Sequence, residues 1–260
     1  RASSDSTSRT PLQLPKPVRF TGTTRGCGWE AKAATASADA PPPSITFVTG
    51  NSGKVARLQL ALSLSPHARA RGTFVRAVDL DVTEIQADTV LEVAQAKALA
   101  AFASMRGAPV LIHDCGLCVA ALNDYPGPYT KYVNYTLGHS GVLAPMRGVT
   151  DRRAGWDEVV VYVDANGESH CFTPRKKYTG EVALEPPTRY VRFAGAERAV
   201  GRIFVPTDHG LHECVADLSE EKYQRYRREA PSVWADFTLW WGTVGTAGVG
   251  RAAGADPAVG

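Results

Sequence analysis

The first segment whose residue types favour chemistry is residues 49–54, Thr-Gly-Asn-Ser-Gly-Lys. It follows a short apolar run, residues 45–48, that predicts a buried strand, and it precedes a helical pattern that extends to about Leu64. A turn from a strand into a helix presents free backbone N–H groups and the positive end of the helix, which together attract phosphate. The spacing is not that of a Walker loop, so a plain strand–helix turn remains the alternative.

A carboxylate lies next to another predicted strand. Residues 109–112 are apolar and predict a buried strand, and Asp114 follows two residues later, within His-Asp-Cys-Gly-Leu. A strand that ends in a carboxylate places it at the carboxyl edge of the sheet, where α/β proteins build their sites. Because Asp at a strand end also caps turns, a purely structural role stays open.

Cysteine usage favours neither a disulfide framework nor a zinc site. The chain has five cysteines, an odd number, and only Cys115 and Cys118 form a CxxC pair. Neither a second pair nor a histidine partner completes a tetrahedral zinc set. We therefore expect both to be ordinary residues in and after a buried strand, in a protein of a reducing compartment.

The elements that must position these residues alternate between strands and helices, which predicts an α/β fold. Asp164-Ala165-Asn166-Gly167 indicates a hairpin turn. The expected elements are a strand over 73–78, a helix over 90–105, hairpin strands over 159–163 and 169–173, a strand over 202–205, a helix from about Ser219, and a last helix carrying Trp234, Phe237 and Trp241.

Composition excludes some classes of function. With 260 residues, 44% hydrophobic and 21% charged, the chain is typical of a globular protein with a substantial core. A formal net charge of +3 is too small to indicate nucleic-acid binding by itself. Since no apolar run approaches the roughly 20 residues that cross a bilayer, we expect no membrane span.

The two ends of the chain differ from its middle. We expect a Pro/Ser/Ala-rich extension over residues 1–44, a globular domain over 45–242 and a Gly/Ala-rich tail over 243–260. The extension has six basic residues and three acidic ones, a bias typical of the remnant of an organelle-targeting precursor. These features predict a mitochondrial location, with the cytoplasm as the alternative, and protein partners that order both tails.

Taken in order, five motifs resemble the inosine triphosphate pyrophosphatase family over residues 45–242. They are Thr-Gly-Asn-x-x-Lys at 49–54, a glutamate at 84, Asp-x-Gly-Leu at 114–117, Pro-Gly-Pro-Tyr-x-Lys at 126–131, and Glu-Glu-Lys at 220–222. The resemblance implies an elongated, two-lobed α/β fold with a central curved mixed sheet flanked by helices, usually in a homodimer. It also implies Mg²⁺-dependent hydrolysis of deaminated purine nucleoside triphosphates to the monophosphate and pyrophosphate.

The same resemblance assigns roles to individual residues. It implies that Asp114 helps bind the metal and activates water, and that Glu84 also holds magnesium. It implies a catalytic role near the phosphates for Lys131. The substrate-binding residues that it implies are Thr49, Asn51 and Lys54 at the triphosphate, and Lys222 and Arg228 near the nucleotide.

The chain departs from the family pattern where the base is recognised. The family's Phe-Gly-Trp/Tyr-Asp-Pro is Arg-Ala-Val-Gly-Arg at residues 198–202, which removes the stacking aromatic and its neighbouring Asp. The family's Ser-His-Arg is Tyr226-Arg227-Arg228, and the acidic residue before Asp114 is His113. Loss of base-recognising groups costs discrimination, so we expect altered or lost selectivity for deaminated purines.

Three functions agree with this pattern. The leading interpretation is a degenerate paralogue recruited as a structural subunit of a large mitochondrial, ribosomal or respiratory assembly. Its basic residues Arg175, Lys176, Lys177, Arg225 and Arg227 would then contact RNA phosphates. The alternative is an active pyrophosphatase with changed base specificity. A regulator that holds a triphosphate without cleaving it lies between the two.

Overall fold

The computed structural model describes residues 43–187, 199–230 and 232–243. The predicted tails therefore lie almost entirely outside the described residues, as does Arg198. The strands are β1 (Ser44–Val48), β2 (Phe74–Val78), β3 (Val110–Val119), β4 (Arg153–Val163), β5 (Ser169–Phe172), β6 (Gly180–Val182) and β7 (Phe204–Val205). The α-helices are α1 (Ser52–Leu64), α2 (Pro66–Ala70), α3 (Val90–Ser104), α4 (Thr130–Tyr135), α5 (Ser140–Leu143), α6 (Glu220–Glu229) and α7 (Val233–Thr243). Short 3₁₀ helices are η1 (Ala120–Leu122), η2 (Gly127–Tyr129), η3 (Val200–Ile203) and η4 (Thr207–His209).

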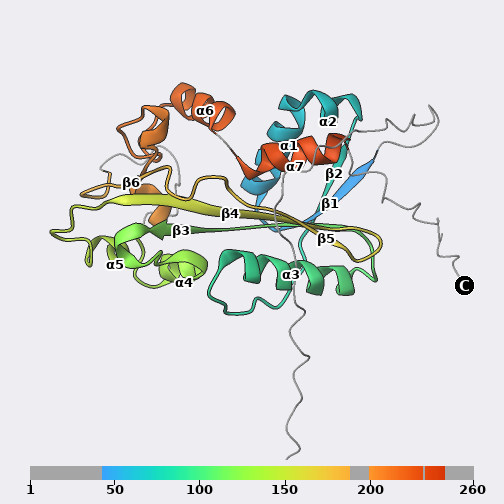
Figure 1. Cartoon of the computed structure of the whole chain (residues 1–260), viewed down its shortest axis with the longest axis horizontal. Coiled ribbons are helices and arrows are strands. Elements are labelled where there is room, and N and C mark those ends of the chain that lie inside the picture. Colours follow the sequence, from blue (N-terminus) through green and yellow to red (C-terminus); the bar gives the residue numbers. More distant parts are fainter. Residues whose placement is uncertain (1–42, 188–198, 231, 244–260) are drawn as a thin grey trace, which may run out of the picture. The chain divides into compact units, whose positions relative to one another are not determined.

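The strands form one mixed sheet in the order β2-β1-β3-β4-β6-β7, and β5 pairs with residues 160–163 of β4, which also pair with β3 (Figure 1). β1 is parallel to both β2 and β3, whereas the pairs that involve β4, β6 and β7 are antiparallel. The predicted α/β class, with a mixed sheet flanked by helices, is confirmed.

β3 is longer than its apolar run predicts, and this changes the position of Asp114. The strand pairs with β4 along its whole length, from Val110 opposite Val163 to Val119 opposite Ala154. Asp114 therefore lies inside the strand and not after its end. β1 stops at Val48, one residue past the pairing of Phe47 with Leu111. Asp114 does lie near the end of a strand, as expected. That strand is the neighbouring β1 and not β3.

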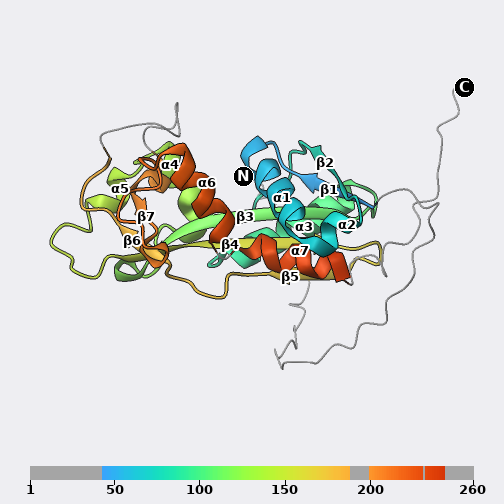
Figure 2. The same ribbon diagram turned by 90° about the horizontal axis from the view of Figure 1, so that it is seen from above.

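Helices cover both faces of the sheet, and each face has its own core. α1, α2 and α7 pack on one face and α3 on the other, as the two views show (Figures 1 and 2). The α7 side buries Trp234, Phe237 and Trp241 against β1 and β4. The α3 side buries small residues of that helix against β3 and β4. A third core lies under α4, α5 and η3 at the other end of the sheet.

Local signals explain several element ends. Asn51, Thr89 and Ser219 are N-caps whose side chains accept hydrogen bonds from the first turns of α1, α3 and α6. The predicted hairpin turn is confirmed between β4 and β5, where Gly167 has a positive φ of 81°. The prediction of a strand over residues 202–205 is wrong for its first half. Residues up to Ile203 form η3, and only Phe204 and Val205 pair with β6.

None of the helices that the structure describes is both long and apolar enough to cross a membrane.

Candidate active site

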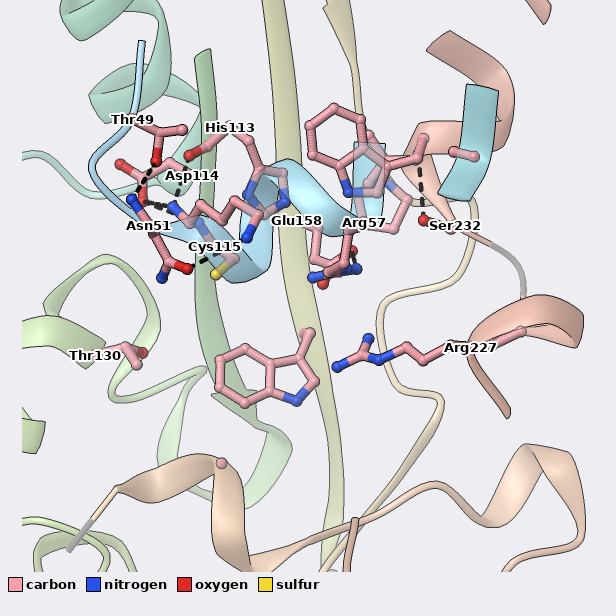
Figure 3. Close-up of a pocket in the computed structure, with 18 of the residues that line it drawn as sticks. Thr49, Asn51, Arg57, His113, Asp114, Cys115, Thr130, Glu158, Arg227 and Ser232 are labelled. Atoms are coloured by element: carbon pink, nitrogen blue, oxygen red, sulfur yellow. Dashed lines mark hydrogen bonds and ion pairs between the residues drawn. The ribbon is translucent and has the colours of Figure 1, made fainter. Parts of the chain in front are cut away.

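A cavity of about 2230 Å³ opens beside the point where β1 ends and β3 continues (Figure 3). Its lining comes from the β1–α1 turn, from β3 and β4, and from α1, α4, α6 and α7. Because several elements contribute side chains to it, residues far apart in the sequence meet there.

The β1–α1 turn builds an anion-binding end. The side-chain oxygen of Asn51 accepts hydrogen bonds from the backbone N–H groups of Gly53 (2.9 Å) and Lys54 (3.2 Å). The Asn51 N–H donates to the hydroxyl of Thr49 at 3.1 Å, which fixes the turn. α1 thus begins at the cavity wall with its positive end, and this arrangement suits phosphate.

Lys54 joins this turn to β3. Its ammonium donates to the backbone carbonyl of His113 at 2.8 Å and lies 4.0 Å from a carboxylate oxygen of Asp114. The same Asp114 oxygen accepts a hydrogen bond from the Cys115 N–H at 3.0 Å, which orients the carboxylate. About a fifth of each side chain, Lys54 and Asp114, is exposed. The pair is therefore ordered yet accessible from the cavity.

Glu84 is held by two lysines. Lys97 of α3 contacts one carboxylate oxygen at 2.5 Å, and Lys131 of α4 contacts the other at 2.8 Å. Burial opposes ionisation of Glu84, but the hydrogen bonds from Lys131 and Lys97 outweigh it and lower the pKa of Glu84 to about 2. The carboxylate is consequently ionised at every physiological pH.

The carboxylate oxygens of Glu84 and Asp114 suit a magnesium ion that also binds a phosphate. Glu84, Asp114 and Lys131 line one small hollow beside the main cavity. Mg²⁺ prefers oxygen ligands and is commonly bound through one or two carboxylates together with substrate phosphates. Two carboxylates next to an anion-binding turn match that requirement. Glu84 and Asp114 would hold the ion, and Lys131 would lie beside the phosphates.

The floor of the cavity is one face of the β3–β4 ladder. In its register Cys115 lies opposite Glu158, and Leu117 lies opposite Trp156. Glu158 accepts a hydrogen bond from Arg57 of α1 at 2.7 Å. Burial would lower the pKa of the Arg57 guanidinium, but the Glu158 carboxylate reverses this and raises it, so Arg57 carries its charge. An ion pair at the cavity therefore joins α1 to the floor.

His113 forms the wall next to α7. Its ring stacks on Trp234 with centroids 4.8 Å apart and an interplanar angle of 26°. Neither ring nitrogen has a hydrogen-bond partner among the described residues. Burial, reinforced by the positive charges of Lys54 and Arg57, holds the pKa of His113 well below its ordinary value. The histidine is therefore neutral, so it brings no charge to the site.

α6 places some of its predicted residues at the cavity but not all. Arg228 and Arg227 line it, and Figure 3 shows the Arg227 side chain extending from α6 toward the strand floor. Lys222 is not among the lining residues, and its ammonium pairs with Glu213 at 2.5 Å. The contact of Lys222 with a nucleotide stays a prediction.

The basic run at residues 175–177 is largely neutralised. Arg175 pairs with Asp236, Lys176 with Asp208, and Lys177 with Asp124, each at 2.5 Å. In a folded chain such pairs lower the positive potential that RNA phosphates would meet. Of the other expected RNA contacts, Arg225 is exposed and Arg227 is turned into the cavity.

The structure brings most of the predicted site residues together and adds others. Those that line the cavity are Thr49, Asn51, Lys54, Glu84, Asp114, Lys131 and Arg228. Sequence reasoning missed Arg57, Lys97, Trp156 and Glu158, which also line it. One signal could have found Lys97, because it is the only cation in the apolar helix α3. Nothing local marks the pairing of Arg57 with Glu158, 101 residues apart.

Comparison with known proteins gives the family of the chain. A sequence model of the Ham1 family matches residues 45–230. A dITP/XTP pyrophosphatase of Thermococcus kodakarensis is 32% identical over 75% of this chain and 96% of its own length. Inosine triphosphate pyrophosphatase 2 of Trypanosoma cruzi is 32% identical over 73% of this chain and 88% of its own.

Solved structures show the same fold. The Ham1 protein of Staphylococcus aureus superimposes with a TM-score of 0.57 at 23% identity, covering 75% of this chain and 98% of that one. A HAM1 protein of Coxiella burnetii gives the same TM-score over 79% of this chain. The chain therefore belongs to the Ham1 family, and the resemblance to inosine triphosphate pyrophosphatases is confirmed.

Proposed function

We propose that this protein is a Mg²⁺-dependent nucleoside triphosphate pyrophosphatase that releases a nucleoside monophosphate and pyrophosphate. The observation that carries the proposal is the meeting of Lys54, Glu84, Asp114 and Lys131 with the start of α1 around one cavity. Cations, a helix N-terminus and two oxygen ligands in one place suit a triphosphate better than any other ligand class. The names of the two relatives support the same activity.

Each residue of the proposed site has its own role in the reaction. The α1 N-terminus and Lys54 bind phosphate oxygens, while Lys131 lies beside Glu84. Asp114 accepts the proton of a water whose oxygen forms a bond to the α-phosphorus. The bond between that phosphorus and the bridging oxygen breaks, and pyrophosphate leaves. Bound magnesium would neutralise charge on the phosphates.

The other hypotheses stay predictions. A recruited structural subunit would use tails that lie almost wholly outside the described residues, and the mitochondrial location rests on the N-terminal composition alone. RNA binding loses support from the ion pairs at Arg175, Lys176 and Lys177. We place the enzyme first because the phosphate end of the cavity is assembled.

The test is pyrophosphate release with Mg²⁺ and a panel of inosine, xanthosine and ordinary nucleoside triphosphates. Asp114→Asn keeps the oxygen that accepts from the Cys115 N–H but cannot take a proton at neutral pH. We expect turnover to fall about 10²- to 10⁴-fold in this variant, the range for loss of a general base. Exposed Asp88 lies outside the cavity lining, so Asp88→Asn is the matched control and should keep full turnover.

Folded protein that releases no more pyrophosphate than Asp114→Asn on any substrate of the panel would rule out the hydrolase. Melting temperatures of both variants within a few degrees of the parent would show that folding does not explain the loss.

A further inference from the structure

Helix α1 is attached to the β3–β4 ladder by two cations. Lys54 and Arg57 are three residues apart and therefore lie on one face of the helix. The Lys54 ammonium donates to the backbone carbonyl of His113 in β3 at 2.8 Å, and the Arg57 guanidinium donates to the Glu158 carboxylate of β4 at 2.7 Å (Figure 3). Because the two acceptors belong to different strands, the helix contacts the ladder at two separate points.

These two points lie before and after Asp114 along β3. His113 directly precedes Asp114, and Glu158 is the register partner of Cys115, which directly follows it. The Cys115 N–H in turn donates to the Asp114 carboxylate at 3.0 Å. The stretch of β3 that carries and orients the Asp114 carboxylate is therefore attached to α1 on both sides.

The same helix begins at the turn that we propose for phosphate binding. Asn51 caps α1 by accepting hydrogen bonds from the Gly53 and Lys54 N–H groups. At 1.5 Å per residue, Arg57 lies only about 6 Å along the helix axis from Gly53. A shift of α1 on the β3–β4 ladder would therefore move bound phosphates relative to Asp114.

Net stability does not account for the ion pair between Arg57 and Glu158. Only 23% of the Arg57 side chain and 14% of the Glu158 side chain is exposed, so both charged groups have lost most of their hydration. Replacement of a buried ion pair by apolar side chains of similar volume is often neutral or stabilising. A charged hydrogen bond differs from an apolar contact in its directionality, because it fixes the distance and angle between two groups. The pair thus suits the positioning of α1 better than its stabilisation.

Resting on the proposed function, we propose that Arg57 and Glu158 are a positioning pair, which holds the phosphate-binding turn of α1 at the distance from Asp114 that the attack of water requires. Arg57 acts through α1, and Glu158 acts through the neighbouring Cys115 section of β3. A misplacement of reacting groups by about 1 Å can cost about 100-fold in rate. The pair therefore contributes to turnover more than to folding.

The test replaces both charges together, so that neither is left buried without its partner. Arg57→Met combined with Glu158→Leu should melt at or above the melting temperature of the parent. The kcat of this double variant for pyrophosphate release with Mg²⁺ should nevertheless fall about 10- to 100-fold. KM should change little, because the phosphate-binding turn moves with α1 and still binds the triphosphate. Steady-state kinetics and thermal unfolding of the same preparations measure these three quantities.

Two further variants show whether the effect belongs to the hydrogen bond between α1 and β4. Arg57→Lys can still donate to the one Glu158 oxygen that Arg57 contacts, and it should keep most of the turnover of the parent. The matched control combines Arg153→Met with Asp151→Leu, which removes an exposed ion pair outside the cavity lining. The kcat and KM of this control should equal those of the parent.

The outcomes separate this inference from the proposed function. A folded Arg57→Met/Glu158→Leu variant with the kcat of the parent would overturn the positioning pair and leave the pyrophosphatase intact. A loss of kcat together with a large drop in melting temperature would also overturn it, because the pair would then serve folding. If the parent releases no pyrophosphate from any triphosphate, both proposals fail. A loss of kcat at an unchanged melting temperature and KM, with turnover kept in Arg57→Lys, would support the positioning pair.

Discussion

Glu84 shows how a single residue depends on partners that its own neighbourhood does not contain. It follows β2, but the lysines that hold it come from α3 and α4. An exposed carboxylate with one lysine would gain little from such a pair. Two partners in a partly buried position instead lower its pKa to about 2. The Glu84 carboxylate therefore carries the negative charge that a metal ion would need.

This shift predicts a pH-dependent contribution to stability. Because the pKa of Glu84 is about 2 in the folded chain and about 4.5 unperturbed, its stabilisation is fully present above pH 4.5 and is lost as pH falls toward 2. Glu84→Gln should therefore be less stable than the parent at pH 6 and converge with it near pH 2. Urea unfolding at several pH values between 2 and 6 measures this difference.

The matched control is Glu181→Gln, an exposed glutamate of β6 outside the cavity lining. The free energy of unfolding of this variant should change with pH in the same way as that of the parent between pH 2 and 6. A constant gap between Glu84→Gln and the parent at every pH would contradict the lysine-held carboxylate.

At the scale of elements, the start of α1 has two tasks. Asn51 caps the helix through hydrogen bonds from Gly53 and Lys54, and it also lines the cavity. Sequence reasoning identified this turn correctly because strand, turn and helix are adjacent in the chain. It placed Asp114 at the end of β3, however, because the long pairing of β3 with β4 is not visible in one strand's composition.

Two substitutions separate the tasks of Asn51. Asn51→Ala removes the cap and should lower the free energy of unfolding by about 1 kcal/mol. Asn51→Asp keeps a capping oxygen and adds a charge that the helix N-terminus favours, so stability should stay within about 0.5 kcal/mol of the parent. Its negative charge next to the phosphates should nevertheless raise the KM for a triphosphate about tenfold or more.

Chemical denaturation and steady-state kinetics on the same preparations measure both effects. An Asn51→Asp variant with the KM of the parent would show that phosphate does not contact this turn.

At the scale of the whole domain, α7 lies late in the sequence but packs in one core with β1 and α1, which lie early in it, and with β4. Trp241 is fully buried among residues of β1, β4 and α1, and its indole N–H donates to the Thr73 hydroxyl at 3.0 Å. Phe237 stacks beside it with ring centroids 6.1 Å apart. The wall that His113 and Trp234 give to the cavity rests on this same core.

Removal of this anchor should be costly. Trp241→Ala should lower the free energy of unfolding by about 3–5 kcal/mol, because it leaves a large cavity and an unpaired Thr73 hydroxyl. Leu239→Ala, at a half-exposed position of the same helix, should cost less than about 1 kcal/mol. Urea unfolding followed by circular dichroism compares the two, and equal effects would contradict a core role for α7.

The sequence by itself determined the features that depend on neighbouring residues. Apolar runs indicated the strands, the turn at residues 49–54 and Ser219 marked helix starts, and Asn166-Gly167 marked the hairpin, because hydrogen bonds of turns and caps reach only a few residues along the chain. The order of the motifs also gave the family. These signals were enough to predict the α/β class and to single out the turn that we propose for phosphate binding.

Only the tertiary structure decided which distant residues meet. The register of β3 on β4 puts Cys115 opposite Glu158, and this brings Glu158 to Arg57 of α1. The same packing pairs Lys222 with Glu213 and places Arg227 at the cavity. Strand register and helix orientation follow from the burial of whole faces, which no single segment specifies. The far end of the cavity was therefore decided by packing and not by any motif.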